Sequence, residues 1–250
     1  VGLLKKGWPD VHIIALEEAG ILKSLNSPIK YNGNTISWHK WSGKISRVSE
    51  EFFLRIKNYD LLKKELNINS KNKIESIKYI FENSNLAFLQ GGPGTGKTTL
   101  IINLILDYLK INQFLNIGLA APTGKASARL KESINKIKKE IKNNYLDKIE
   151  CQTLHRWIYN SSNRSANLKF RLKELDIFVI DEMSMVSIDI IESVIQLLAR
   201  DCKILLVGDA NQLPPINNCS IWNYIFEDKV NHLFSVCTVN LDKTYRNSGD

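Results

Sequence analysis

The stretch GGPGTGKTT, residues 91–99, constrains the fold more than any other part of the sequence. It fits the spacing G-x-x-x-x-G-K-[ST] from Gly91 to Thr98, follows an apolar run at residues 86–89 and precedes a helical pattern. Such glycines let backbone N–H groups turn inward around a polyphosphate at a helix N-terminus. The alternative is a Gly-rich strand-to-helix turn with no binding role, but the full eight-position match favours a nucleotide site.

The same stretch predicts individual roles. Lys97 would bridge the β- and γ-phosphates of ATP, and the Thr98 hydroxyl would hold Mg²⁺. The residues expected to bind the nucleotide are Gly92, Pro93, Gly94, Thr95, Gly96, Lys97, Thr98 and Thr99.

Apolar runs alternate with amphipathic stretches from residue 86 onward. The runs predict buried parallel strands at 86–89, 117–121, 177–180 and 204–207, and a shorter run at 233–239 could add another. The amphipathic stretches predict helices at 98–110, 125–142 and 188–199. This alternation indicates an α/β fold, with a parallel sheet flanked by helices.

The first 70 residues follow a different, mainly helical pattern. We expect a helix at 11–25, a turn leading into a strand at 31–38, and a helix at 49–66. The polar stretch NINSKNK at 67–73 makes a boundary. We therefore predict a small N-terminal docking region, 1–70, and a larger domain, 71–250.

Two acids follow the predicted strand in FVIDEMSMV, residues 178–186. Asp181 is placed as the Mg²⁺ partner that a P-loop needs at a neighbouring strand end, and Glu182 is placed to polarise an attacking water. The two acids could instead only begin the next helix, where negative charge near the N-terminus is stabilising. Their position directly after a buried strand favours catalysis, and hydrolysis over a kinase reaction.

The stretch VGDANQLPPI, residues 207–216, ends another predicted strand with a polar turn. Carboxyl ends of parallel strands meet at one edge of a sheet. Gln212 would therefore lie beside the P-loop and sense the γ-phosphate or the attacking water, while Pro214 and Pro215 would stiffen the segment that follows.

Net charge is +8, and it is unevenly distributed. Residues 123–173 hold thirteen Lys and Arg against four Asp and Glu, a balance of +9. This block indicates a polyanion partner, although a solvated lysine-rich helix explains the charge equally well.

Composition excludes several classes of protein. No run approaches the ~20 apolar residues of a membrane span. The chain opens without a signal peptide, and its first residue is Val, as in an excised segment. The four cysteines, at 151, 202, 219 and 237, lack C-x-x-C spacing and favour buried free thiols in a reducing cytoplasm.

Six stretches in order carry a family resemblance: GGPGTGKTT, LAAPTGKASARL, TLHRW, VIDEMSM, VGDANQLPPI and LDKTYR. They resemble motifs I, Ia, Ib, II, III and IV of superfamily 1 DNA helicases. APTGKASARL and TLHR are most similar to the RecD family, which includes the α subunit of exodeoxyribonuclease V. The resemblance runs from Asn72 to the end of the sequence, and SPIKYNGNTISWHKW is similar to the family's N-terminal region.

This resemblance implies a RecA-like P-loop NTPase domain, the first motor domain of an ATP-dependent 5′→3′ DNA helicase in double-strand break repair or recombination. The partners that it implies are single-stranded DNA, duplex DNA ends and the nuclease and helicase subunits of a RecBCD-type complex, with no membrane. The implied bacterial location is the cytoplasm.

The resemblance also implies further site residues. Those that would face the single-stranded DNA backbone are Thr123, Gly124, Lys125, Thr153, His155 and Arg156. Arg246 would approach the γ-phosphate. Residues 158–172 occupy the place of a small β-hairpin that can split duplexes, although a disordered loop fits this Asn- and Ser-rich stretch nearly as well.

The sequence departs from the family pattern at two points. The family places an adenine-reading Gln before the first strand, but NSKNKIESI has none and Asn72 is the nearest amide, so the choice of base stays open. Motifs V and VI do not follow motif IV before Asp250. We therefore expect this chain alone to bind nucleotide, to hydrolyse it slowly and to unwind nothing.

Two other functions stay open at this point. One is a P-loop DNA-dependent ATPase that never unwinds, and the other is a nucleotide-gated DNA-binding module. Intact Lys97, Asp181, Glu182 and Gln212 argue against the second, since a pure switch can lose Glu182.

Overall fold

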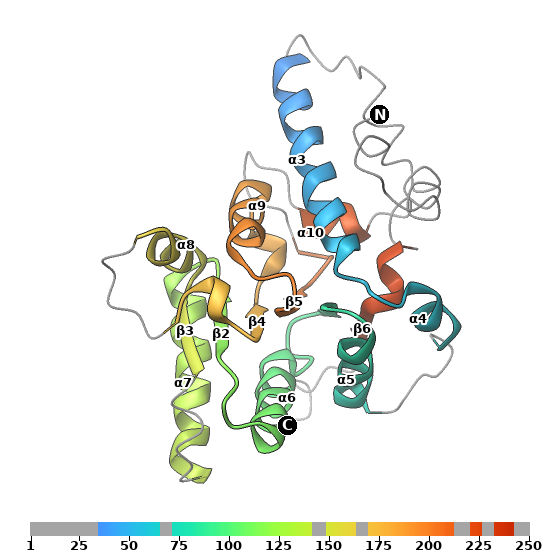
Figure 1. Ribbon diagram of the computed structural model, residues 1–250. Coiled ribbons are helices and arrows are strands. Elements are labelled where there is room, and N and C mark those ends of the chain that lie inside the picture. The colour runs from blue at the N-terminus through green and yellow to red at the C-terminus, as the bar shows by residue number, and fades with distance from the viewer. Residues whose placement is uncertain are drawn as a thin grey trace, which may run out of the picture.

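A six-stranded parallel sheet forms the centre of the computed structural model (Figure 1). The structure describes residues 35–65, 72–141, 149–163, 170–212, 221–226 and 233–242. The strand order is β3-β2-β4-β5-β1-β6. The strands are β1 (Leu86–Gly91), β2 (Ile117–Ala121), β3 (Ile149–Thr153), β4 (Ile177–Ile180), β5 (Lys203–Gly208) and β6 (Thr238–Leu241). The predicted fold class, a parallel sheet flanked by helices, is confirmed.

The four central strands are the ones that the apolar runs predicted. Every residue of β2 and β4 is buried, because helices cover both faces of the sheet. The edge strand β3 was not predicted, since its sequence IECQT is polar and mostly half-buried. The run at 233–239 is a strand only from Thr238, and Ser235–Cys237 before it form the short helix η5.

Two layers of helices cover the sheet. In Figure 1, α5 (Lys73–Asn83) and α6 (Lys97–Ile111) lie below it, and α3 (Thr35–Leu54) and α9 (Ile188–Leu197) lie above it. The chain runs from β1 to β3 in one direction along the sheet and then back to β6. Right-handed crossovers place the helices of these two passes on opposite faces. The remaining helices are α4 (Tyr59–Glu65), α7 (Gly124–Ile141), α8 (Leu154–Ser162) and α10 (Ile221–Phe226).

The apolar core joins the first described helix to the sheet. Phe88 of β1 lies within a cluster of aromatic rings, at 6.0 Å from Phe52 of α3, 6.1 Å from Trp222 and 5.7 Å from Phe234, between ring centroids. These four side chains are 0% exposed. Residues 35–65 therefore share one core with the sheet, and the domain boundary near residue 70 stays a prediction.

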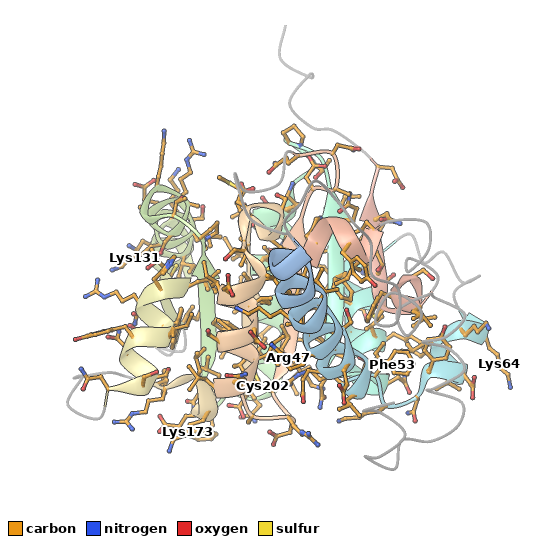
Figure 2. All side chains as sticks on the ribbon, turned by 90° about the horizontal axis from the view of Figure 1, so that it is seen from above. Arg47, Phe53, Lys64, Lys131, Lys173 and Cys202 are labelled. Carbon is orange, nitrogen blue, oxygen red and sulfur yellow. The ribbon has the colours of Figure 1, made fainter. Side chains whose placement is uncertain are left out.

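Charged side chains add a second connection between α3 and α9. Lys44 is paired with Asp189, and Nε of Arg47 lies 2.7 Å from Oε1 of Glu192. Figure 2, seen from above, shows α3 in front of the sheet with Arg47 on it. Arg55, just beyond α3, is 3% exposed, and burial lowers the pKa of its guanidinium. Its Nη1 donates to the carbonyl oxygens of Ala199, Arg200 and Cys202 at 3.0, 3.2 and 3.3 Å.

The predicted strand within 31–38 is wrong where it can be compared. Residues 35–38 are the first turn of α3, and 31–34 lie outside the described residues, as does the predicted helix at 11–25. Thr35 and Ile36 favour strands locally. Later residues of the same helix, Val48 and Phe52, are buried one turn apart, and a helix once formed extends at little cost.

The helix predicted at 49–66 is interrupted at residues 55–58. There Ile56 forms an antiparallel bridge with Ser84, and the N–H groups of Lys57 and Asn58 both donate to the carbonyl of Asn83. Contacts with a distant segment replace the helical hydrogen bonds, and α4 begins afterwards at Tyr59.

Candidate functional site

The P-loop connects β1 to α6 by a turn that only glycine adopts without strain. Gly94 has φ 79° and Gly96 has φ 84°, both in the left-handed region. Gly96 is also the residue before the first helical turn of α6. The loop therefore closes directly onto a helix N-terminus, where unpaired N–H groups favour an anion.

Lys97 is the first residue of α6, directly after this loop. Its Nζ donates to the carbonyl oxygens of Gly91 at 2.5 Å and Gly92 at 2.8 Å. Thr95 supports the same turn, because its Oγ1 donates to Gly92 O at 2.9 Å. The ammonium group is thus held beside the loop at the edge where the strands end.

Asp181 follows β4 and is 8% exposed. Burial raises the pKa of its carboxyl to about 6, the charge of Glu182 adds to that rise, and Lys97 opposes it. The backbone N–H of Glu182 donates to Asp181 Oδ1 at 2.9 Å. A buried carboxylate beside a loop that favours an anion suits a metal ion between the two, which would offset the cost of its charge.

Glu182 has φ 56° and ψ 42°, and no other non-glycine residue in the described chain has positive φ. This left-handed conformation costs roughly 1–2 kcal/mol for a residue with a Cβ. Strained backbone of this kind clusters at functional sites. It turns the chain sharply from β4 into the short helix η4, Met183–Met185.

The turn after β5 lies beside the P-loop. Gln90 of β1 pairs in register with Gly208, and a Cβ placed on Gly92 would lie 4.0 Å from Asp209 Oδ2. Within the turn, Asp209 Oδ1 accepts from Asn211 N at 2.9 Å. Oε1 of Gln212 accepts a hydrogen bond from Ser184 Oγ at 2.9 Å. The structure thus brings Gln212 to the segment that carries Asp181 and Glu182.

The predicted DNA residues lie at the next strand ends along the same edge. Ala121 of β2 pairs in register with Thr153 of β3. Thr123 Oγ1 accepts from Ala126 N at 3.2 Å at the start of α7, and Thr153 Oγ1 accepts from Arg156 N at 3.4 Å at the start of α8. Two threonine-capped helix N-termini therefore open side by side.

Exposed basic side chains lie near these two helix N-termini. Lys125, His155 and Arg156 are exposed, and a Cβ on Gly124 would have nothing within 4 Å. Further exposed cations follow along α7 at Arg129, Lys131 and Lys136; Figure 2 labels Lys131. In the described part of the basic block, most charge therefore faces solvent.

Several predicted features fall elsewhere. Residues 158–162 belong to α8, so the part of the proposed hairpin that precedes residue 163 is helical. Residues 164–169, Pro214, Pro215 and Arg246 lie outside the described residues. Asn72 caps α5 through its side-chain oxygen, which accepts from Ile74 N at 3.1 Å.

Sequence reasoning missed Ser184 and Gln90, which hold the Gln212 turn. Ser184 lies inside VIDEMSM, but the spacing of that stretch carries no sign of a partner 28 positions away. Gln90 directly follows the predicted strand 86–89 and belongs to β1 in the structure, where its Oε1 accepts from Ala210 N at 3.2 Å. A polar side chain at the end of an apolar run was the available signal.

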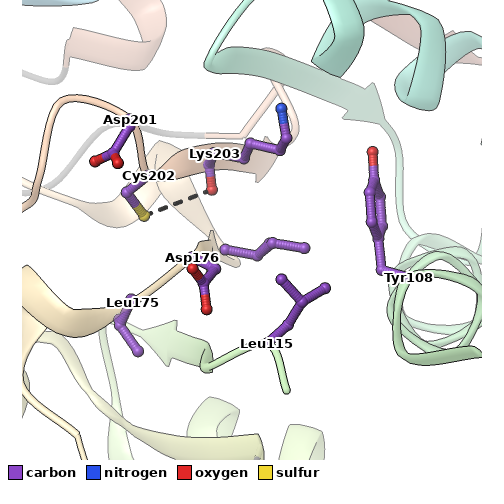
Figure 3. A pocket seen from close by; sticks show the side chains of 8 residues that line it. Tyr108, Leu115, Leu175, Asp176, Asp201, Cys202 and Lys203 are labelled. Atoms are coloured by element: carbon purple, nitrogen blue, oxygen red, sulfur yellow. Dashed lines mark hydrogen bonds between the residues drawn. The ribbon is translucent and has the colours of Figure 1, made fainter. Parts of the chain in front are cut away.

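A separate cavity of about 190 Å³ lies at the amino ends of the strands, away from the P-loop (Figure 3). Burial raises the pKa of Tyr108 there to about 12. The lining residues are Tyr108, Leu115, Leu175, Asp176, Ile177, Asp201, Cys202 and Lys203. None of them was predicted as a site residue.

Comparison with known proteins places the chain in a family. A protein-family model described as an AAA domain matches residues 74–218, which is more than half of the chain. The chain belongs to the AAA domain family. The matched span contains the P-loop, Asp181, Glu182 and Gln212, so this AAA domain is a nucleotide-using one.

Relatives of the AAA domain confirm the resemblance to RecD. The RecBCD enzyme subunit RecD of Buchnera aphidicola (subsp. Schizaphis graminum, strain Sg) is 37% identical over 154 residues, 57% of this chain and 25% of that protein. The ATP-dependent RecD2 DNA helicase of Deinococcus radiodurans is 32% identical over 132 residues, 53% of this chain and 16% of that protein. The chain thus spans about a quarter or less of the length of these relatives.

Among solved structures, a Pif1 helicase from Bacteroides in complex with ADP-AlF3 and single-stranded DNA is 20% identical to this chain. The similarity has a TM-score of 0.44 and covers 72% of this chain and 43% of that one. Among the described residues of this chain, no helix is long and apolar enough to cross a membrane.

Proposed function

We propose that the AAA domain is the ATP-binding first motor domain of an ATP-dependent DNA helicase that acts in double-strand break repair or recombination. The observation that carries this proposal is that two groups of candidate residues occupy neighbouring parts of one edge of the sheet. The ends of β4, β5 and β1 hold the candidate nucleotide residues, and the ends of β2 and β3 hold two open helix N-termini with exposed cations. Nucleotide and DNA sites on neighbouring strand ends suit an enzyme that couples the two.

In the nucleotide half, the P-loop N–H groups and Lys97 would bind the phosphates of ATP. Thr98 and Asp181 would hold Mg²⁺, which supplies positive charge to the phosphates when bound. No group of three or more His, Cys, Asp or Glu in the described residues could hold a metal ion alone. This fits Mg²⁺ in phosphate sites, where one or two carboxylates suffice alongside phosphates and water.

The hydrolytic roles fall to Glu182 and Gln212. Glu182 would accept a proton from the attacking water, and Gln212 would contact the γ-phosphate or that water. Lys97 and Arg246 would stabilise negative charge that develops on the transferred phosphoryl group.

In the DNA half, Thr123, Gly124, Lys125, Thr153, His155 and Arg156 would bind the backbone of single-stranded DNA. Helix N-termini and exposed cations recognise phosphate without reading bases. We propose duplex ends as the substrate and 5′→3′ as the direction, on the RecD resemblance. On the same resemblance we propose that the protein acts in the bacterial cytoplasm. Its proposed partners are nuclease and helicase subunits of a RecBCD-type complex.

The test uses the full-length protein that contains this chain. ATP hydrolysis is measured with and without single-stranded DNA, beside separation of duplexes that carry a 5′ or a 3′ tail. The proposal expects DNA-stimulated hydrolysis and unwinding from the 5′-tailed duplex. Stimulated hydrolysis without strand separation would identify a DNA-dependent ATPase instead. Nucleotide-dependent DNA binding without turnover would identify a nucleotide-gated binding module.

A further inference from the structure

A buried hydroxyl outside the predicted site residues contacts the proposed sensor. Ser184 lies in η4, two residues after Glu182, and is 0% exposed. Its Oγ donates to Oε1 of Gln212 at 2.9 Å across 28 positions of sequence. The bond joins the turn after β4 to the turn after β5.

The main chain that carries Gln212 is held by three hydrogen bonds of its own. Asp209 O accepts from Gln212 N at 3.1 Å, and Asp209 Oδ1 accepts from Asn211 N at 2.9 Å. Oε1 of Gln90 accepts from Ala210 N at 3.2 Å. With the main chain set, the orientation of the Gln212 amide depends on what its side chain contacts.

The two ends of an amide are chemically opposite. The oxygen accepts hydrogen bonds, and the nitrogen donates two. Ser184 engages the oxygen, which leaves the Nε2 hydrogens as the end that a ligand can meet. The γ-phosphate of ATP carries only acceptor oxygens, so it can bind the nitrogen end and is repelled by the oxygen end.

On the basis of the function proposed above, we propose that Ser184 is a positioning residue for ATP hydrolysis. It holds Oε1 of Gln212 so that the amide nitrogen faces the γ-phosphate. It also ties this contact to the turn that carries Asp181 and Glu182, so that a movement of either turn reaches the other. A merely structural Ser184 would change stability and leave the response to the γ-phosphate intact.

The experiment compares Ser184→Ala, Gln212→Ala and the double variant in the full-length protein. Ser184→Ala should lower kcat of DNA-stimulated hydrolysis about tenfold, equivalent to about 1.4 kcal/mol. In the Gln212→Ala background, the same change should lower kcat less than twofold, because its effect passes through the amide. The matched control is Ser193→Ala, which removes a hydroxyl that donates to Asp189 O at 2.9 Å within α9. It should leave kcat unchanged.

A second measurement does not depend on turnover. Titration with ADP and with a non-hydrolysable ATP analogue gives the preference for the γ-phosphate. Ser184→Ala should reduce that preference several-fold and leave ADP affinity unchanged. Gln212→Glu gives an independent check, since a carboxylate still accepts from Ser184 but offers no donor, and it should lose the preference with the fold intact.

Wild-type kcat and γ-phosphate preference in a folded Ser184→Ala protein would overturn the inference. Independent losses that multiply in the double variant would overturn it as well. If Ser184→Ala does not fold, a wild-type preference in Gln212→Glu is the overturning result. Failure of the wild type to hydrolyse ATP in the presence of DNA would instead reject the proposed function, and the nucleotide titrations would still decide the role of Ser184.

Discussion

At the scale of single residues, the candidate nucleotide site combines groups whose conformations or charges cost free energy. Glu182 adopts a left-handed backbone, and Asp181 is a carboxyl group with 8% exposure. Such costs are tolerated where a ligand or a reaction uses them. Changes at these residues should therefore separate folding from activity.

Lys97→Ala should abolish nucleotide binding or hydrolysis in the full-length protein with little loss of fold. Its ammonium contacts two P-loop carbonyl oxygens and no apolar core. Circular dichroism and a nucleotide titration measure the two properties. A folded variant with unchanged ATP affinity and turnover would contradict the assignment.

Asp181→Asn should stabilise the protein without ligand above pH 6 and make no difference below pH 4. The folded pKa is raised to about 6 from the usual 3.8, so between these two values the carboxyl ionises in the unfolded state while it stays protonated in the folded state, and this favours unfolding. Wild-type stability should fall by up to about 3 kcal/mol relative to the variant as pH rises through this window. Denaturant unfolding between pH 4 and pH 8 measures it, and a constant difference across this range would contradict the cause.

At the scale of elements, the starts of α7 and α8 bring separate stretches of sequence to one surface. Thr123 and Thr153 cap these helices at paired strand ends, and exposed cations stand within the first turns. Neither helix alone makes this surface. If this surface binds DNA, the binding is electrostatic and independent of base sequence.

Lys125→Ala with Arg156→Ala should weaken binding of single-stranded DNA about equally for all sequences. The slope of log affinity against log salt should fall by about 0.7 for each lost phosphate contact. Binding titrations at several salt concentrations measure this slope. Lys64→Ala, which removes an exposed charge from α4, is the control. An unchanged slope in the double variant would mean that these charges only face solvent.

At the scale of the whole molecule, α3 and the sheet form one packed unit. Phe52 reaches the aromatic cluster around Phe88, and Arg55 binds three carbonyl oxygens beyond the end of α9. The N-terminal region is thereby joined to the helix that follows the Asp181 and Glu182 turn. Its described part is a structural component of the same packed unit as the sheet.

Arg55→Met should lower the free energy of unfolding by about 2–4 kcal/mol, because it leaves three carbonyl oxygens without their hydrogen-bond donor. Arg47→Met, on the exposed side of α3, should cost under about 1 kcal/mol, since surface ion pairs contribute little. Denaturant titrations of both variants measure the difference. Equal losses would show that the buried hydrogen bonds of Arg55 do not hold α3 in place.

Local pattern was sufficient for much of the fold and for part of the candidate site. Strands β1, β2, β4 and β5 were predicted because strands buried on both faces must be apolar throughout. The P-loop was predicted because left-handed turns need glycine at set positions. Both requirements act within a few neighbouring residues, so the sequence by itself displays them.

Tertiary structure alone decided the features that depend on partners far along the chain. The polar strand β3 is ordered by its pairing with β2, residues 35–38 are helical because their helix packs on the core, and the helix breaks at 55–58 where Ile56 meets Ser84. The bond between Ser184 and Gln212 belongs to the same class. No local preference encodes such contacts, because their stability arises only when folding brings two distant segments together and removes both from water.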